Sequence, residues 1–256
     1  MNIGFFDSGM GGLSVLREAL VILPSENYIY YGDTDNAPYG VKTTDEVKRL
    51  TFNAVKFMVS KNIKALVVAC NTATSAAVRD LRKEYGFPVI GMEPAVKPAV
   101  QKSLSGGKRV LVLATALTLK EEKFHNLVSR LDADHIVDMQ PAPKLVELAE
   151  KFIFQGPEVE SYLKEILPWD NMQKYGTVVL GCTHFPLFRQ ALTDILPEHI
   201  DIIDGNRGTI NHLKEILKAS NLLNPSIEKG NITFYKSGVQ VIDRDSLEMF
   251  EKLLHE

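Results

Sequence analysis

Short apolar runs alternate with longer amphipathic stretches along the chain, and this alternation limits the possible folds more than any other feature. The runs have the length of buried strands, and the stretches between them are long enough for helices. Parallel strands joined by crossover helices produce this order. The sequence therefore predicts an α/β fold, with strands at Ile3–Phe6, Tyr28–Tyr31, Ala65–Ala69, Val89–Gly91, Val110–Ala114, Val178–Gly181 and Ile200–Ile203, and a weaker one at Ile232–Tyr235.

Some helices have clear start signals or a clear apolar side. Thr43 and Glu46 form a capping-box pattern ahead of apolar residues at helical spacing. A closing helix carries Leu247, Phe250 and Leu254 on one side. A further helix is expected over Leu145–Phe154.

The chain also contains a faint internal repeat. Residues 64–72 and 176–184 each read as a buried strand that ends in a small residue, followed by Cys and short polar residues that open a helix. This predicts two pseudo-symmetric domains, each a mostly parallel sheet flanked by helices. Ligands of open α/β sheets bind beyond the carboxyl ends of the strands. Both strand-end loops are therefore expected to open into one cleft between the domains.

Length and composition exclude several classes of protein. A chain of 256 residues has room for one large domain or two small ones. A net charge of −3 gives no electrostatic reason to expect nucleic acid or an anionic membrane as partner. No run approaches the roughly 18 apolar residues of a membrane span, and the first residues do not resemble a signal peptide. We therefore expect a cytoplasmic protein.

The two cysteines, Cys70 and Cys182, are too few for a disulfide framework. A lone cysteine in a core strand is most often a small apolar residue. Here, however, both follow an apolar run and stand beside helix-capping residues, and a helix N-terminus lowers the pKa of a neighbouring thiol. Neither zinc-ligand spacing nor a Cys-x-x-Cys pair is present, so we expect no metal. Catalytic thiols are the favoured interpretation.

Other polar residues have weaker signals. The loop Asp7-Ser8-Gly9-Met10-Gly11-Gly12 suggests a dinucleotide-binding turn with Asp33 as the ribose-binding acid, but Ser14 replaces the last glycine of that signature. A tight structural turn explains the glycines equally well. Pro38-Tyr39-Gly40 alone indicates a turn. His184 follows Cys182 by two residues and could hold a thiolate or deliver a proton.

Taken together, these segments resemble the glutamate racemases over essentially the whole chain. The resemblance is carried by Phe6-Asp7-Ser8-Gly9, Tyr31-Gly32-Asp33, Pro38-Tyr39-Gly40, Cys70-Asn71-Thr72-Ala73-Thr74, Gly91-Met92-Glu93-Pro94 and Gly181-Cys182-Thr183-His184, in this order. It implies a discontinuous first domain, residues 1–95 with 206–256, and a second domain of residues 96–205. It also implies a homodimer without a cofactor, which supplies D-glutamate to peptidoglycan synthesis.

The resemblance also assigns roles to individual residues. Cys70 would be the base for D-glutamate, assisted by Asp7, and Cys182 the base for L-glutamate, assisted by His184. Glu150 would belong to a polar network at the site. Without the resemblance, Glu150 would be interpreted as a solvated surface charge. The substrate's carboxylates and amino group would be held by Asp7, Ser8, Tyr39, Gly40, Asn71, Thr72, Thr183 and His184.

Two thiols suit racemisation, because one base must remove the α-proton from one face while an acid returns a proton to the other. Three alternatives stay open. A related cofactor-free enzyme could act on aspartate or another dicarboxylate. A non-catalytic protein could bind glutamate and leave its handedness unchanged. A nicotinamide-dependent enzyme is opposed by the broken glycine signature.

Overall fold

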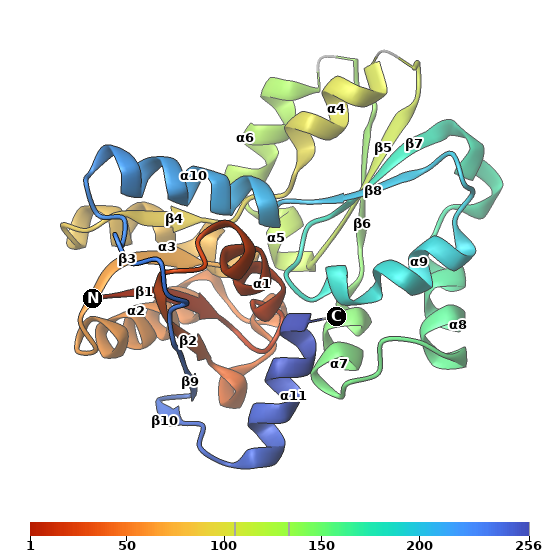
Figure 1. Cartoon of the computed structure of the whole chain (residues 1–256). Helices are drawn as coiled ribbons and strands as arrows, with labels where there is room; N and C mark the ends of the chain where they lie inside the picture. Colours follow the sequence, from red (N-terminus) through yellow and green to blue (C-terminus); the bar gives the residue numbers. More distant parts are fainter. Residues whose placement is uncertain (105, 133, 256) are drawn as a thin grey trace. The chain divides into compact units, whose positions relative to one another are not determined.

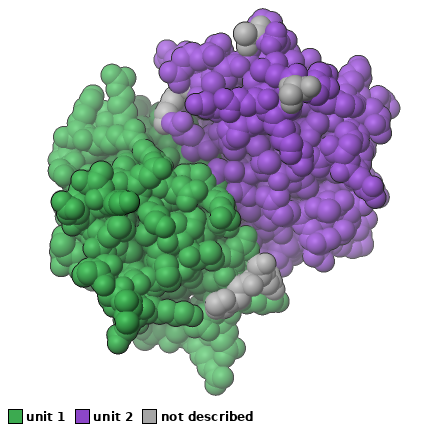
Figure 2. Space-filling view, turned by 45° about the horizontal axis from the view of Figure 1, so that its top comes forward, with its two compact units in different colours: residues 1–92, 206–256 green, residues 93–205 purple. Residues whose placement is uncertain are grey.

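The structure is a computed structural model that describes residues 1–104, 106–132 and 134–255. It divides into two compact units, shown in two colours in Figure 2. Unit 1 contains residues 1–92 and 206–256, and unit 2 contains residues 93–205. Unit 1 is therefore discontinuous in sequence. Cys70 belongs to unit 1 and Cys182 to unit 2.

The strands of unit 1 form a sheet in the order β10-β9-β2-β1-β3-β4 (Figure 1). Neighbouring strands pair in parallel, except that β10 runs antiparallel to β9. Every residue of β3 is buried, as expected for an inner strand of a parallel sheet covered on both faces. The bounds are β1 Asn2–Asp7, β2 Asn27–Gly32, β3 Ile63–Val68, β4 Val89–Gly91, β9 Ile232–Lys236 and β10 Val239–Gln240.

The helices of unit 1 pack in two groups, α1 with α10 and α11, and α2 with α3 (Figure 1). The predicted start of α2 is confirmed, since Thr43 Oγ1 accepts the N–H of Glu46 at 3.3 Å. The closing helix is confirmed as α11, with Phe250 and Leu254 buried. The bounds are α1 Leu13–Ile22, α2 Thr44–Val59, α3 Asn71–Glu84, α10 Asn206–Ala219 and α11 Arg244–His255, with 3₁₀ helices η1 Thr34–Asn36 and η2 Tyr39–Val41.

Unit 2 contains a parallel sheet in the order β6-β5-β7-β8. Side chains of β5 alternate between two apolar cores, with Leu111 and Leu113 in one and Val110, Val112 and Ala114 in the other. Both faces of this sheet are therefore covered. The bounds are β5 Arg109–Ala114, β6 Val137–Pro141, β7 Tyr175–Leu180 and β8 Asp201–Asp204.

The helices of unit 2 connect these strands and supply many residues of its two cores. Their bounds are α4 Val96–Leu104, α5 Ala116–Lys120, α6 Glu122–Leu131, α7 Pro143–Glu150, α8 Pro157–Ile166 and α9 Arg189–Ile195, with 3₁₀ helices η3 Trp169–Lys174 and η4 Phe185–Phe188. In the part of the chain that the structure describes, no helix is both long and apolar enough to cross a membrane.

The internal repeat is present in the topology. Strands β1 to β4 and β5 to β8 take the same spatial order, with the second strand outside the first and the third and fourth on its other side. The register shifts at the start of β1–β3 and again at the start of β5–β7. Beyond the strands, Ala69 N–H donates to Phe6 O at 2.8 Å, and Gly181 N–H donates to Leu113 O at 2.7 Å. The predicted fold class is thereby confirmed.

Three details of the predicted elements differ from the structure. The edge strand β6 was not predicted, because its sequence VDMQP is polar and only partly buried. Strand β10 was also missed, since two residues give no pattern. The helix expected over Leu145–Phe154 is wrong in both bounds. It is α7, which begins two residues earlier with Pro143 in its first turn and ends at Glu150, and Phe152 is left-handed with φ 59°.

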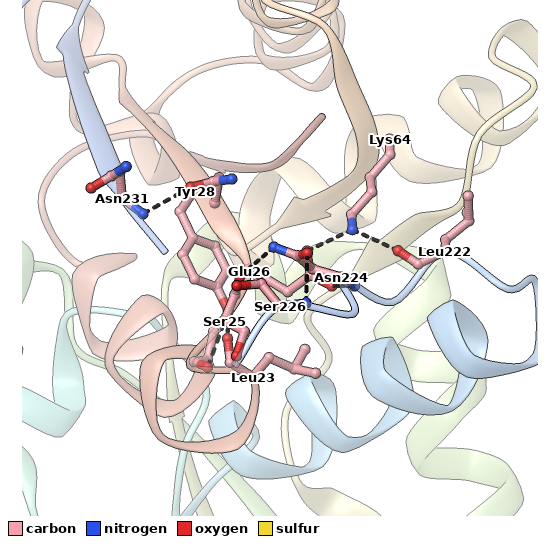
Figure 3. A network of polar contacts seen from close by, with 11 residues as sticks. Leu23, Ser25, Glu26, Tyr28, Lys64, Leu222, Asn224, Ser226 and Asn231 are labelled. Atoms are coloured by element: carbon pink, nitrogen blue, oxygen red, sulfur yellow. Dashed lines mark hydrogen bonds and ion pairs between the residues drawn. The ribbon is translucent and has the colours of Figure 1, made fainter. Parts of the chain in front are cut away.

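A buried ion pair joins the C-terminal segment of unit 1 to its sheet (Figure 3). Lys64 Nζ lies 2.6 Å from Glu26 Oε2, and both side chains are less than a tenth exposed. The ammonium also donates to Leu222 O at 2.6 Å, and Glu26 Oε1 accepts the N–H of Asn224 at 2.7 Å. Residues 222–224 are therefore fixed to β3 and to the residue just ahead of β2.

Candidate active site

Cys70 lies at the N-terminus of α3, two residues after β3 ends. Its Sγ accepts the backbone N–H of Ala73 at 3.4 Å and contacts Ser8 Oγ at 3.5 Å. The first N–H groups of a helix have no partner within the helix, and the helix dipole is positive at this end. Cys70 is buried, with 5% of its surface exposed. The structure therefore confirms the predicted position of this cysteine at a helix N-terminus.

Asp7 is the last residue of the adjacent strand β1, and Ser8 follows it at the same edge of the sheet. β1 pairs in parallel with β3, so Asp7 and Cys70 stand at neighbouring strand ends. Asp7 is fully buried, and its Oδ2 accepts the N–H of Gly9 at 3.1 Å. The structure thus brings Asp7, Ser8 and Cys70 together. We call these residues, with Tyr39, the Cys70 site.

The glycines of the opening loop have a packing reason. A Cβ at Gly12 would lie 2.6 Å from the Cβ of Asp7, and a Cβ at Gly32 would lie 2.6 Å from Gly9 O. The Tyr30 hydroxyl donates to Gly9 O at 2.7 Å, which fixes the loop to β2. Close packing therefore accounts for Gly12 of this loop and for Gly32 of β2 without a bound phosphate.

Tyr39 is buried, and its hydroxyl donates to Asp33 Oδ2 at 2.6 Å. Burial raises the pKa of Tyr39, and the hydrogen bond and charge of Asp33 raise it further. The phenol therefore stays protonated and directed at Asp33. The sequence placed Tyr39 and Gly40 among the substrate-binding residues, and the structure leaves Gly40 partly exposed at the same turn.

Cys182 stands two residues after β7 and is 8% exposed. The sequence repeat predicted that short polar residues after it open a helix, and Thr183 and His184 lead into a 3₁₀ helix rather than an α-helix. Phe185 N–H donates to Cys182 O at 3.1 Å in a turn, η4 follows, and α9 begins only at Arg189. Pro186 lies in the first positions of η4, where its missing N–H costs no helical hydrogen bond. Cys182 therefore lacks the α-helix N-terminus that Cys70 has.

The polar group beside Cys182 is the imidazole of His184 rather than an α-helix N-terminus. Its Nδ1 lies 3.7 Å from Cys182 Sγ, and its Nε2 lies 2.6 Å from Glu150 Oε1. Burial lowers the pKa of His184, but hydrogen bonds and charge from Cys182 and Glu150 outweigh this and raise it well above its ordinary value. An imidazolium here donates to Glu150 on one side and faces the sulfur on the other. Glu150, Cys182, Thr183 and His184 form the Cys182 site.

The remaining predicted residues lie next to the two thiols. Asn71 and Thr72 form the first turn of α3, and Thr183 separates Cys182 from His184. All three are buried. Within residues 1–104, 106–132 and 134–255, no group of three or more His, Cys, Asp and Glu side chains could hold a metal ion.

Sequence reasoning missed two polar residues near the Cys70 site. Asp33 entered only as a possible ribose ligand and as part of a motif, yet its Oδ1 also accepts hydrogen bonds from Asn36 at 3.0 Å and Ser237 at 3.1 Å. Ser237 was not considered, because no local pattern connects it with a segment 204 residues earlier. Its one signal is its place before Gly238 in a tight turn.

Comparison with known proteins gives consistent matches. A family model described as Asp/Glu/Hydantoin racemase matches residues 14–213. The glutamate racemase of Halothermothrix orenii is 55% identical over 256 residues, which is 100% of both chains. The crystal structure of glutamate racemase from Francisella tularensis in complex with D-glutamate has a TM-score of 0.82 and 28% identity, covering 100% of this chain and 94% of that one. The Escherichia coli glutamate racemase in complex with L-glutamate and the activator UDP-MurNAc-Ala has a TM-score of 0.81 and 30% identity, covering 97% and 95%.

Proposed function

The chain belongs to the Asp/Glu/Hydantoin racemase family, and from this premise we propose that it interconverts L-glutamate and D-glutamate with two thiols and no cofactor. One observation carries the proposal. Two buried cysteines follow equivalent strands of two units with the same topology, and each has its own polar partners. We also propose that these two units are the catalytic domains and that both thiols act on one substrate molecule.

From L-glutamate, the Cys182 thiolate removes the α-proton and becomes a thiol. The His184 ring lies beside this sulfur, and Glu150 keeps the ring in place. The Cys70 thiol then delivers its proton to the opposite face of the carbanion, which yields D-glutamate and a Cys70 thiolate. Ala73 N–H and Ser8 stand beside that new charge. The reverse reaction exchanges the two roles.

Without a cofactor, the carbanion must be stabilised by fixed dipoles around the substrate carboxylate. Backbone amides and hydroxyls at the strand ends are suited to this task. We assign it to Ser8, Asn71, Thr72 and Thr183, with the turn at Tyr39 and Gly40 closing the Cys70 site. Complexes of two similar racemases with D-glutamate and L-glutamate support the choice of substrate.

From the resemblance to the glutamate racemases we further propose that the enzyme is a cytoplasmic homodimer that supplies D-glutamate for peptidoglycan. Light scattering at micromolar concentration tests the dimer, for which we expect twice the mass of one chain. Depletion in the native host tests the cellular role, and D-glutamate in the medium should restore cell-wall synthesis.

The decisive experiment is a cofactor-free assay. Purified protein is treated with a chelator and with a carbonyl reagent, mixed with L-glutamate and followed by circular dichroism. We expect the signal to decay to zero, because the enantiomers have equal free energy. Saturable binding of glutamate with an unchanged signal would make the protein a carrier. Decay with L-aspartate but not L-glutamate would assign another substrate and retain the two-thiol chemistry.

A further inference from the structure

The turn between β9 and β10 contains a serine in a backbone conformation that serine rarely adopts. Ser237 and Gly238 join the paired residues Lys236 and Val239, with φ values of 44° and 90°. A two-residue hairpin loop with positive φ at both positions strongly prefers Asn-Gly, Asp-Gly or Gly-Gly. Serine at the first position is strained, since side chains other than Asn and Asp rarely adopt this conformation. A residue that opposes its local preference often serves another purpose.

The Ser237 side chain connects the hairpin to the loop after β2. Its hydroxyl donates to Asp33 Oδ1 at 3.1 Å and accepts the N–H of Asp35 at 3.0 Å. Its own N–H donates to Gly32 O at 2.8 Å. Donor and acceptor are both used, so the hydroxyl fixes the loop that begins at Gly32 from two directions.

Asp33 connects Ser237 with the Cys70 site through direct hydrogen bonds. Its carboxylate is 4% exposed and lies between Ser237 on Oδ1 and Tyr39 on Oδ2. Its backbone N–H donates to Asp7 O at 3.0 Å. The ring of Tyr39 packs on Phe6, with centroids 6.2 Å apart, and Phe6 O accepts the N–H of Ala69, the residue before Cys70.

We propose that Ser237 is a positioning residue of the Cys70 site, which holds Asp33 and through it the Tyr39 turn against the end of β1. Ser237 does not itself touch the thiol. Its effect on turnover rests on the proposed racemase function, whereas its effect on the geometry around Cys70 does not.

The variant Ser237→Gly separates this role from a structural one. Glycine relieves the strained backbone but removes the side chain with its two hydrogen bonds, so we expect the melting temperature to change little. We expect kcat/KM to fall about 10-fold, since a freed loop misplaces the site. The control is Ser246→Ala, a serine of the same region whose Oγ accepts a hydrogen bond from Lys236 Nζ at 3.0 Å. It should leave kcat/KM unchanged.

A double-variant cycle tests the route of the effect. If Ser237 acts through Asp33 and Tyr39, then Ser237→Gly added to Tyr39→Phe should lower kcat/KM no further than Tyr39→Phe alone. Multiplication of the two separate losses would overturn the route, because it would mean that the residues act independently.

Thiol reactivity gives a readout that does not depend on racemisation. Iodoacetamide labelling followed by mass spectrometry measures the alkylation rate of each cysteine. Ser237→Gly should speed labelling of Cys70 at least about 3-fold, because the turn that covers it is loosened, and leave Cys182 unchanged. Equal labelling of Cys70 in both proteins overturns the inference even if the enzyme racemises glutamate. If the unsubstituted protein does not racemise glutamate, the proposed function fails, and the labelling still decides the role of Ser237.

Discussion

Asp7 and Ala114 are the last residues of strands that hold the same place in the two sheets, and each accepts a hydrogen bond from the residue after the second strand. Asp33 N–H donates to Asp7 O and Ala142 N–H to Ala114 O, both at 3.0 Å. One position carries a carboxylate and the other a methyl group. The sheets therefore repeat, while the polar partners of the two thiols do not. We expect the two thiols to respond differently to substitution.

The first prediction concerns the two bases. Cys70→Ser and Cys182→Ser should each abolish racemisation in both directions, because a serine hydroxyl is far less acidic than a thiol. In D2O the remaining thiol can still exchange the α-proton on its own face. Cys182→Ser should then label D-glutamate preferentially, and Cys70→Ser should label L-glutamate, as measured by NMR. Substantial racemisation by either variant would contradict the two-thiol mechanism, and the opposite labelling would exchange the two faces.

The second prediction concerns Glu150. Glu150→Gln removes the charge that orients the His184 imidazolium, so kcat from L-glutamate should fall about 10- to 100-fold. The matched control is Glu147→Gln on the exposed side of the same helix, which should keep full activity. Circular dichroism in both directions gives kcat and KM separately, although the ratio of the two kcat/KM values stays at one for enantiomers. Equal losses in the two variants would remove Glu150 from the site.

The third prediction concerns pH. The pKa of His184 is higher in the folded protein than in the unfolded chain, where it is about 6.5, so folding binds a proton. This stabilisation is complete below about pH 6.5 and is lost as the pH rises through the folded value. The unsubstituted protein should therefore have a higher free energy of unfolding than His184→Asn. We expect this difference to be larger in mildly acidic buffer than in alkaline buffer. Urea titrations across this range measure the difference, and a gap that grows with pH would reverse the sign.

The fourth prediction concerns the ion pair of Lys64 and Glu26. Glu26→Gln or Lys64→Met leaves one buried charge without its partner and should lower the free energy of unfolding by about 3–5 kcal/mol. The control is Lys48→Met, which breaks the exposed pair of Lys48 and Asp80 and should cost less than about 1 kcal/mol. Urea denaturation decides between them, and a cost at Lys64 as small as at Lys48 would show that the pair contributes little.

The fifth prediction concerns substrate choice. Glutamate should exceed aspartate by at least about 100-fold in kcat/KM, because each polar partner lost by the shorter substrate costs about 1–3 kcal/mol. In the proposed mechanism both thiols must reach the α-carbon, so aspartate cannot shift to recover those contacts. Initial rates on the two L-amino acids measure the ratio. Comparable rates would indicate a broader racemase with the same chemistry.

The sequence predicted those parts of the fold and the site that depend on local pattern. The inner strands appeared as apolar runs, and both cysteines lie just after such runs, as predicted. Strand β6 was hidden because an edge strand carries polar residues. The contact of His184 with Glu150 spans 34 residues and that of Ser237 with Asp33 spans 204, so only the folded chain brings these pairs together.

Because unit 1 is discontinuous in sequence, its two parts are translated at different times, before and after unit 2. β2 pairs with β9 from Tyr28 to Gly32, yet β9 is translated only after the whole of residues 93–205. Unit 2 is complete in the nascent chain before unit 1 can complete its sheet, so unit 2 is able to fold first. Until residues 232–236 emerge, the edge of β2 lacks its parallel neighbour and is open to mispairing. A chain that terminates before β9 would therefore retain both cysteines while its first sheet remains unfinished.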